Sequence, residues 1–195
     1  MNPQQAAVRF QDALRREDWR AAERALRQLL EVDRANPSLH HNLGLVLRRQ
    51  GRDADAVSAF DTALRLAPAH PSAAFERAAA LMDSGRLDEA EAGFRDHLAR
   101  QSEDADALLN LGRLLYRRDA AEAAAEMFGR RLVLLPHDLE ATIGKAEADQ
   151  RLGRREGRAT LRRLYRERPA LRPRLLKIMT QGPTGAVPLD LSALL

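Results

Sequence analysis

The sequence predicts an all-α protein, a right-handed solenoid of about five helical hairpins followed by a capping helix and an extended tail. Two observations predict this fold. Residues that favour helices, such as Ala, Leu, Arg and Glu, are abundant, while aromatic residues make up only 4% of the chain. In addition, one pattern of small and apolar residues returns every 34 residues. With 195 residues, the chain has room for one short solenoid or one compact domain.

Three columns of residues carry the repeat. A small residue returns in the first helix of the hairpins, and an alanine and a bulky apolar residue return in the second helix. The columns are Gly44, Ala78, Gly112 and Ala146; Ala22, Ala56, Ala90 and Ala124; and Leu26, Phe60, Phe94 and Phe128. The small residues allow two helices to approach closely, and the phenylalanines fill the space between neighbouring hairpins.

Each hairpin is expected to turn where its first helix ends. Gly51, Gly85 and Gly153 stand at this position in three hairpins. We expect the backbone there to enter the left-handed region, which glycine tolerates because it has no Cβ atom. Asp119 and Glu17 stand at the same position in the other two hairpins, where this conformation costs more.

This pattern resembles the tetratricopeptide repeat family. Units of that family have this length, with a small residue in the first helix, an alanine and an aromatic residue in the second helix, and a closing proline. Pro68 and Pro136 match the closing proline. The resemblance implies five units, with expected bounds of 3–36, 37–70, 71–104, 105–138 and 139–172. The two end units depart from the pattern. Phe10 replaces the small residue in the first, and Arg158 and Arg162 replace the alanine and the aromatic residue in the fifth. Terminal repeats of solenoids are often atypical because one face meets solvent or a cap.

The C-terminal part of the chain follows these units. The segment RPRLLKIMT at 172–180 is short and amphipathic, and we place a capping helix at 173–181, where its apolar residues cover the last hairpin. Glycine and proline residues then interrupt the chain, so 182–195 is expected to be an extended or flexible tail.

The chain carries no pattern typical of catalysis, of a cofactor or of a metal. It has no cysteine, which excludes a disulfide framework, a thiolate zinc site and a cysteine nucleophile. Its five histidines lack the same-face spacing of metal ligands on a helix, and no phosphate-binding loop or hydrolase motif occurs. We therefore expect a non-catalytic protein with no catalytic, cofactor-binding or metal-binding residues.

The resemblance also implies that the first helices line a concave groove that binds a peptide segment of a partner. The expected contact residues are His41, Asn42, Leu45, Arg49, Phe75, Glu76, Ala79, Leu109, Asn110, Arg113, Tyr116, Arg117 and Arg151. Asn42 and Asn110 are equivalent, and a carboxamide can hydrogen bond to the N–H and the C=O of an extended peptide together. The alternative is a structural asparagine bonded to the adjacent repeat.

The chemistry of this groove favours a ligand with acidic and aliphatic residues. Its arginines suit carboxylates, and its apolar side chains suit aliphatic groups. The tail sequence VPLDLSALL at 187–195 has this composition. We therefore hypothesise that the tail docks in the groove of its own or a neighbouring molecule, which is one route to self-association.

Positive charge is concentrated near the C-terminus. Residues 151–177 hold eleven basic and two acidic side chains, a net charge of +9, whereas the whole chain has a net charge of +4. The first interpretation is a solvated arginine surface, the second is a site for an acidic protein partner, and the third is nucleic acid. Nucleic acid is disfavoured because Tyr165 is the only aromatic residue there for base stacking.

Together these observations predict a protein–protein interaction module or assembly scaffold. The alternative is a substrate-recruiting or regulatory arm of a fused or neighbouring enzyme, for example a transferase. No segment has the length of a membrane span, and the N-terminus lacks the apolar run of a signal peptide, so we expect a cytoplasmic bacterial protein.

Overall fold

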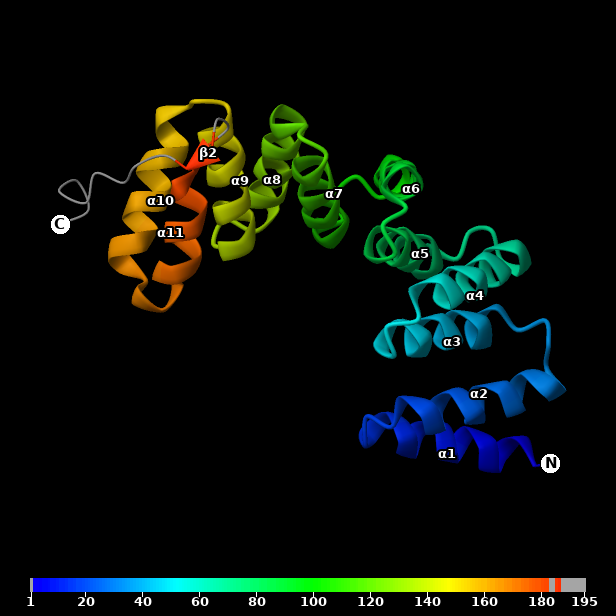
Figure 1. The fold of residues 1–195 in the computed structure, drawn as a ribbon. Coiled ribbons are helices and arrows are strands. Elements are labelled where there is room, and N and C mark those ends of the chain that lie inside the picture. The colour runs from blue at the N-terminus through cyan, green and yellow to red at the C-terminus, as the bar shows by residue number, and fades with distance from the viewer. Residues whose placement is uncertain (1, 183–184, 187–195) are drawn as a thin grey trace. The chain divides into compact units, whose positions relative to one another are not determined.

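The computed structural model describes residues 2–182 and 185–186, and these residues are almost entirely helical. They form eleven α-helices, one short 3-10 helix and two strands of two residues each (Figure 1). The chain divides into two compact units, residues 1–100 and 101–195. The all-α repeat fold predicted from the sequence is confirmed.

The first unit contains three pairs of helices (Figure 1). The pairs are α1 (Pro3–Arg15) with α2 (Trp19–Val32), α3 (Pro37–Arg49) with α4 (Asp53–Leu66), and α5 (Pro71–Asp83) with α6 (Leu87–Arg100). Within the unit, each helix packs on its neighbours in sequence. The packing is therefore local along the chain, as it is in a repeat protein.

The second unit contains two further pairs and a C-terminal helix. The pairs are α7 (Ala105–Arg117) with α8 (Ala121–Leu134) and α9 (Leu139–Arg151) with α10 (Arg155–Glu167); the 3-10 helix η1 (Pro169–Leu171), α11 (Arg172–Thr180), β1 (Gln181–Gly182) and β2 (Gly185–Ala186) follow. The two strands pair antiparallel, with Gln181 opposite Ala186. Most of the expected tail, and with it the segment proposed to dock in the groove, lies outside the described residues.

The first helix of every pair begins at a residue whose side chain caps it. These capping side chains accept hydrogen bonds from backbone N–H groups of the first turn, which otherwise lack partners. The capping residues are Asn2, Asn36, His70, Asp104 and Asp138. The sequence thus fixes the start of each first helix through a local hydrogen bond.

The turns inside the pairs have the predicted left-handed backbone. The φ angle is +72° at Gly51, +82° at Gly85 and +77° at Gly153. Asp119 and Glu17 adopt the same region, with φ of 66° and 52°. All five predicted positions are confirmed, two of them with a side chain that makes this conformation costly.

Close approach of helices explains the columns of small and aromatic residues. A Cβ atom on Gly44 would lie 2.5 Å from the ring of Phe60. A Cβ on Gly112 would lie 2.8 Å from the ring of Phe128, and a Cβ on Gly144 would lie 2.6 Å from the same ring. Phe128 on α8 therefore fills the space between α7 and α9, as expected for the aromatic column.

The last pair buries residues one position earlier than the repeat predicts. In α10, Gly157 and Leu161 are buried, whereas Arg158 and Arg162, at the alanine and aromatic positions, are exposed. Gly157 is needed here because a Cβ atom would lie 2.5 Å from the carbonyl oxygen of Ala146.

The capping role predicted for the C-terminal helix is confirmed by its packing. Leu175 and Ile178 of α11 form one apolar cluster with Leu161 and Leu164 of α10 and with Ile143 of α9. This helix covers apolar surface of the last pair that would otherwise meet water, which stabilises the second unit.

Candidate functional site

The expected contact residues are divided between the two units, and each unit carries its own set on its first helices. In the first unit these lie on α3 and α5, and in the second on α7 and α9. Six of the thirteen residues form two rows of three, which occupy equivalent positions in the two units. The rows are Asn42, Leu45 and Arg49 on α3 and Asn110, Arg113 and Arg117 on α7. Residues at this spacing share one face of a helix.

His41 packs between other rings rather than standing free. Its ring centroid lies 4.8 Å from that of His70 and 5.8 Å from that of Phe60. Burial lowers the pKa of His41, the charge of His70 lowers it further, and Glu76 opposes both effects. Its Nε2 atom is buried without a hydrogen-bond partner among the described residues. A neutral His41 is therefore favoured.

Glu76 is paired with an arginine, Arg48, that the repeat pattern does not indicate. The Arg48 guanidinium on α3 donates hydrogen bonds to Glu76 and to Asp83 Oδ2 on α5, the latter at 2.7 Å. This arrangement joins two neighbouring first helices and offsets part of the negative charge of Glu76 and Asp83. The spacing of the repeat gives no signal for such a pair, because the two residues belong to different helix pairs.

The other first-unit residues are divided between packing and exposed positions. Ala79 is buried, and the ring of Phe75 packs against Phe94 and His97, at 5.9 and 5.7 Å between centroids. Leu45 is half-buried, and the exposed Arg49 lies with its guanidinium carbon 5.7 Å from the centre of the Trp19 ring.

Asn110 is the expected backbone-binding residue of the second unit, and its side chain has no partner among the described residues. It is half-buried on α7, next to the buried Leu109. Among the described residues it has no hydrogen bond from its carboxamide, so no bond to an adjacent repeat occupies it. Asn42, its equivalent, is also half-buried, and its side chain hydrogen bonds to the neighbouring His41.

A polar cluster joins α7 and α9 near the turn at Asp119. The Tyr116 hydroxyl donates a hydrogen bond to the Glu147 carboxylate. The Arg151 guanidinium carbon lies 5.1 Å from the centre of the Tyr116 ring, and its Nε lies 3.1 Å from Asp119 Oδ1. Burial and the adjacent Glu147 raise the pKa of Tyr116 to about 12. Burial also raises the pKa of Glu147, against the hydrogen bond that Tyr116 donates.

The two remaining arginines of the second unit differ in their surroundings. Arg113 Nη2 lies 3.0 Å from Glu140 Oε2, and Glu140 also accepts two hydrogen bonds from Arg174 on α11. Arg117, one turn further along α7, is exposed and has no partner among the described residues. A ligand carboxylate thus meets one free guanidinium and one that is shared with an exposed carboxylate.

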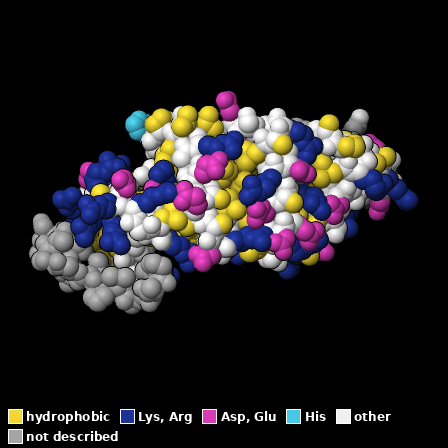
Figure 2. Space-filling view, turned by 90° about the horizontal axis from the view of Figure 1, so that it is seen from above, with side chains coloured by type: hydrophobic (Ala, Val, Ile, Leu, Met, Phe, Trp, Pro, Cys, Tyr) yellow, Lys and Arg dark blue, Asp and Glu magenta, His cyan; other side chains and the backbone are white. Residues whose placement is uncertain are grey.

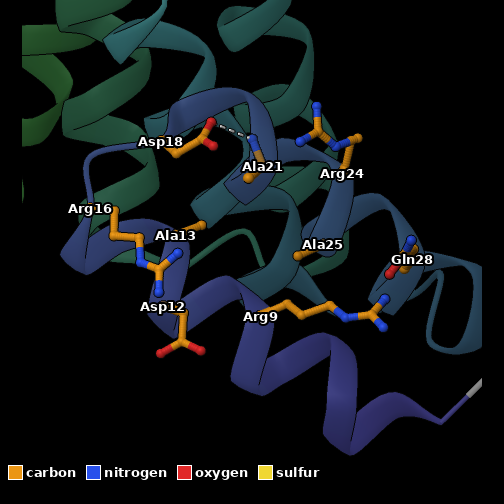
Figure 3. Close-up of a pocket in the computed structure, with 9 residues that line it drawn as sticks. All are labelled: Arg9, Asp12, Ala13, Arg16, Asp18, Ala21, Arg24, Ala25 and Gln28. Carbon is orange, nitrogen blue, oxygen red and sulfur yellow. Dashed lines mark hydrogen bonds between the residues drawn. The ribbon is translucent and has the colours of Figure 1, made fainter.

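Surface charge of both signs is interspersed with apolar side chains on the face drawn in Figure 2. One depression of about 320 Å³ lies between α1 and α2 (Figure 3). Arg9, Arg16 and Arg24 line it together with Asp12 and Asp18. Opposite charges and small alanines line this depression, so it has no preference for one charged ligand.

Within the described residues, no cluster of side chains could hold a metal ion, and no helix is both long and apolar enough to cross a membrane. The chemistry offered by the first-helix faces is hydrogen bonding, ion pairing and apolar contact.

Comparisons with known proteins agree with this architecture. The family model of the tetratricopeptide repeat matches residues 8–71, 43–102 and 75–138, which together span about two thirds of the chain. A comparison with curated protein sequences found no match.

Solved structures similar to this fold are also repeat proteins. A tetratricopeptide repeat protein from Parabacteroides merdae is 22% identical, with a TM-score of 0.80 over 91% of this chain and 73% of that one. MamA 41-end from Desulfovibrio magneticus is 19% identical, with a TM-score of 0.75 over 91% and 94% of the two chains. YrrB, described as a protein of this repeat class with an unusual peptide-binding site, is 24% identical, with a TM-score of 0.63 over 68% of each chain. The repeat period, the left-handed turns, the paired helices and the family match agree, and the chain belongs to the tetratricopeptide repeat family, whose members are in general protein-interaction modules.

Proposed function

We propose that this protein is a non-catalytic module that binds an extended peptide segment of a partner along the first-helix faces of its units. The observation that carries the proposal is the half-buried Asn110 carboxamide, which has no partner among the described residues. A carboxamide offers a donor and an acceptor, so it can bind the N–H and the C=O of a peptide backbone whatever the side chains are.

The neighbouring side chains on α7 would select the ligand. Arg113 and Arg117 follow Asn110 on the same helical face. Arg117 is free to bind a ligand carboxylate, and Arg113 can exchange its exposed pair with Glu140 for another carboxylate. An acidic residue beside an aliphatic one is therefore the preferred ligand chemistry, as expected from the sequence.

The row on α3 supports a weaker second contact. Asn42 is equivalent to Asn110, but it shares a hydrogen bond with His41 and is followed by the apolar Leu45. We therefore expect the first unit to hold peptide backbone and aliphatic groups and the second unit to supply most of the selection for acidic residues. This division follows from the side chains of each unit taken alone.

The test is peptide display against the full chain, followed by fluorescence anisotropy with the selected peptides. The Asn42→Ala/Asn110→Ala variant is expected to bind them at least about tenfold more weakly, because two or more hydrogen bonds are lost. The matched control is Ser58→Ala/Ser102→Ala, which removes one exposed hydroxyl from each unit. Equal affinity for the wild type and the asparagine variant would overturn the proposal.

A synthetic VPLDLSALL peptide tests the self-docking hypothesis separately. If the tail is a ligand, this peptide competes with the selected peptides and loses affinity in the asparagine variant. Failure to compete would remove the tail as an occupant and leave the binding of partner peptides to be decided by the first experiment.

A further inference from the structure

Helix α10 has two faces of opposite character. Gly157, Leu161 and Leu164 are buried on one side, against the rest of the second unit. The other side carries five exposed arginines and one alanine, with the exposed Glu156 and Glu167 at one edge. We call this surface the arginine face; it consists of Arg155, Arg158, Arg162, Arg163 and Arg166.

Helical geometry concentrates these charges. With about 100° between successive residues, Arg155, Arg162 and Arg166 lie within about 40° of one another, opposite the buried side. Glu156 and Glu167 lie on one flank, within about 40° of Arg163 but about 80° or more from Arg155, Arg162 and Arg166. The arginine face extends for roughly 16 Å along α10, at about 1.5 Å per residue. Such a row of like charges is destabilising unless anions bind it.

Within the part of the chain that the structure describes, none of these five arginines has a hydrogen bond, an ion pair or a ring contact. Two arginines just outside the face behave differently. Arg154 donates from Nη2 alone to both carboxylate oxygens of Glu122, at 2.5 and 2.7 Å, whereas Arg174 uses Nη1 and Nη2 to bind the two oxygens of Glu140, at 2.6 and 3.0 Å. Two-pronged binding of a carboxylate is thus the chemistry that this segment already uses.

The charge around the arginine face limits what can occupy it. Residues 101–150 of the same unit hold ten acidic and six basic side chains, a net charge of −4. Figure 2 shows Lys and Arg side chains gathered over the part of the chain where α10 and α11 lie. A long polyanion would extend past this positive patch onto a negative surface, whereas a short acidic segment would not.

Base recognition also lacks its usual support here. Tyr165 is the one aromatic residue of α10, and it is half-buried with the Arg172 guanidinium carbon 5.3 Å from the centre of its ring. No aromatic side chain of α10 is therefore open for a base to stack on, which is what single-stranded nucleic acid binding uses.

We propose that the arginine face docks an acidic segment of a partner protein, whose Asp and Glu carboxylates bind the five guanidinium groups in two-pronged pairs. This surface is on a second helix and shares no residue with the proposed peptide-binding rows on α3 and α7. The two proposals are therefore independent, and the protein has two kinds of partner contact.

The experiment measures binding of the full chain to a labelled oligoglutamate peptide, and to a duplex DNA oligonucleotide of equal charge, at physiological salt. The Arg158→Gln/Arg162→Gln/Arg166→Gln variant is expected to bind oligoglutamate about tenfold more weakly than the wild type, because each exposed contact contributes modestly. The matched control is Arg20→Gln/Arg24→Gln/Arg65→Gln, which removes equal charge from exposed arginines of α2 and α4 and is expected to bind like the wild type.

A lysine variant separates charge from geometry. Arg158→Lys/Arg162→Lys/Arg166→Lys keeps the charge but cannot form two-pronged pairs, so it is expected to lose part of the affinity for oligoglutamate. Circular dichroism and thermal unfolding confirm that each variant is folded.

Four outcomes would overturn the proposal. They are no binding of oligoglutamate, tighter binding of the DNA than of the peptide, equal loss in the control variant, and full affinity in the lysine variant. Because the rows on α3 and α7 can also bind an acidic peptide, the three arginine-to-glutamine substitutions are also made in the Asn42→Ala/Asn110→Ala background. They are expected to cause the same loss of about tenfold there, so failure of the peptide-binding proposal and failure of this one are distinguishable.

Discussion

The pair α7/α8 and the pair α9/α10 use the same repeat differently. In α8, Phe128 has a glycine of α7 on one side and a glycine of α9 on the other. In α10, the equivalent position is Arg162, which is exposed, and Leu161 is buried instead. The difference teaches that the aromatic column is needed where a second helix lies between two first helices. Where only a short capping helix follows, the position is free to carry charge.

The largest expected effect tests this contrast at one column. Phe128→Ala should lower the free energy of unfolding by about 4 kcal/mol, because it opens a cavity between α7 and α9. Arg162→Ala, at the equivalent position, should change it by less than about 0.5 kcal/mol. Urea unfolding followed by circular dichroism measures both. Similar losses in the two variants would show that the column is equally structural in both pairs.

Replacing two glycines, Gly157 in the pair α9/α10 and Gly129 in the pair α7/α8, is expected to change the free energy of unfolding by a smaller amount. The two changes are expected to have opposite signs. Gly157→Ala should lower the free energy of unfolding by about 2 kcal/mol, because the new Cβ would lie 2.5 Å from the Ala146 carbonyl oxygen. Gly129→Ala in α8 should raise it by about 0.5 kcal/mol, because a Cβ there meets only the end of Lys145, at 3.8 Å, and alanine favours the helix. Thermal unfolding distinguishes the signs, and a stabilising Gly157→Ala would contradict the close approach of α10 to α9.

The smallest expected effect is a pH dependence of local stability. Its direction is expected to differ between His41, in an internal helix pair, and Glu147, in the last helix pair. His41 packs on Phe60 of the internal pair α3/α4, and burial lowers its pKa, so below about pH 6.5 the unfolded chain binds more protons. Stability from His41 is therefore present above that pH and is lost as the pH falls. Glu147 in α9 has a pKa raised by burial, so the folded chain takes up its proton first and its contribution increases as the pH falls toward that pKa.

Hydrogen exchange measured by mass spectrometry between pH 7 and pH 5 checks both signs. After correction for the intrinsic exchange rate, protection of α3 should decrease and protection of α9 should increase as the pH falls. His41→Phe should abolish the first change and Glu147→Gln the second. If α3 protection falls equally in His41→Phe, another group is responsible.

The parts of the fold that depend on local sequence were predictable. The turn positions, including the costly ones at Asp119 and Glu17, follow from the spacing and from the handedness of the backbone. The burial shift in α10 was not predictable, because it depends on how many helices surround that helix. The repeat period alone assigns Arg158 and Arg162 to buried columns. It does not indicate how many helices pack around α10.

The candidate site was predictable as a set of positions but not as a set of contacts. The asparagine and arginine rows follow from the repeat, whereas the pairing of Arg48 with Glu76 and of Arg113 with Glu140 depends on side chains from different helices. The burial of Arg131 also depends on side chains from other parts of the chain. It occupies a column where Ala63 is fully buried, and it is itself buried because it binds Asp106 and Asp138.

The shared position of Phe128 has a consequence for cooperativity. Its ring contacts the first helix of its own pair and the first helix of the next, so neither α7 nor α9 can separate from α8 without exposing the same side chain. In a chain of repeats, the energy of such interfaces sets how far an unfolding event spreads. We therefore expect this one aromatic ring to make α7, α8 and α9 open together instead of one hairpin at a time.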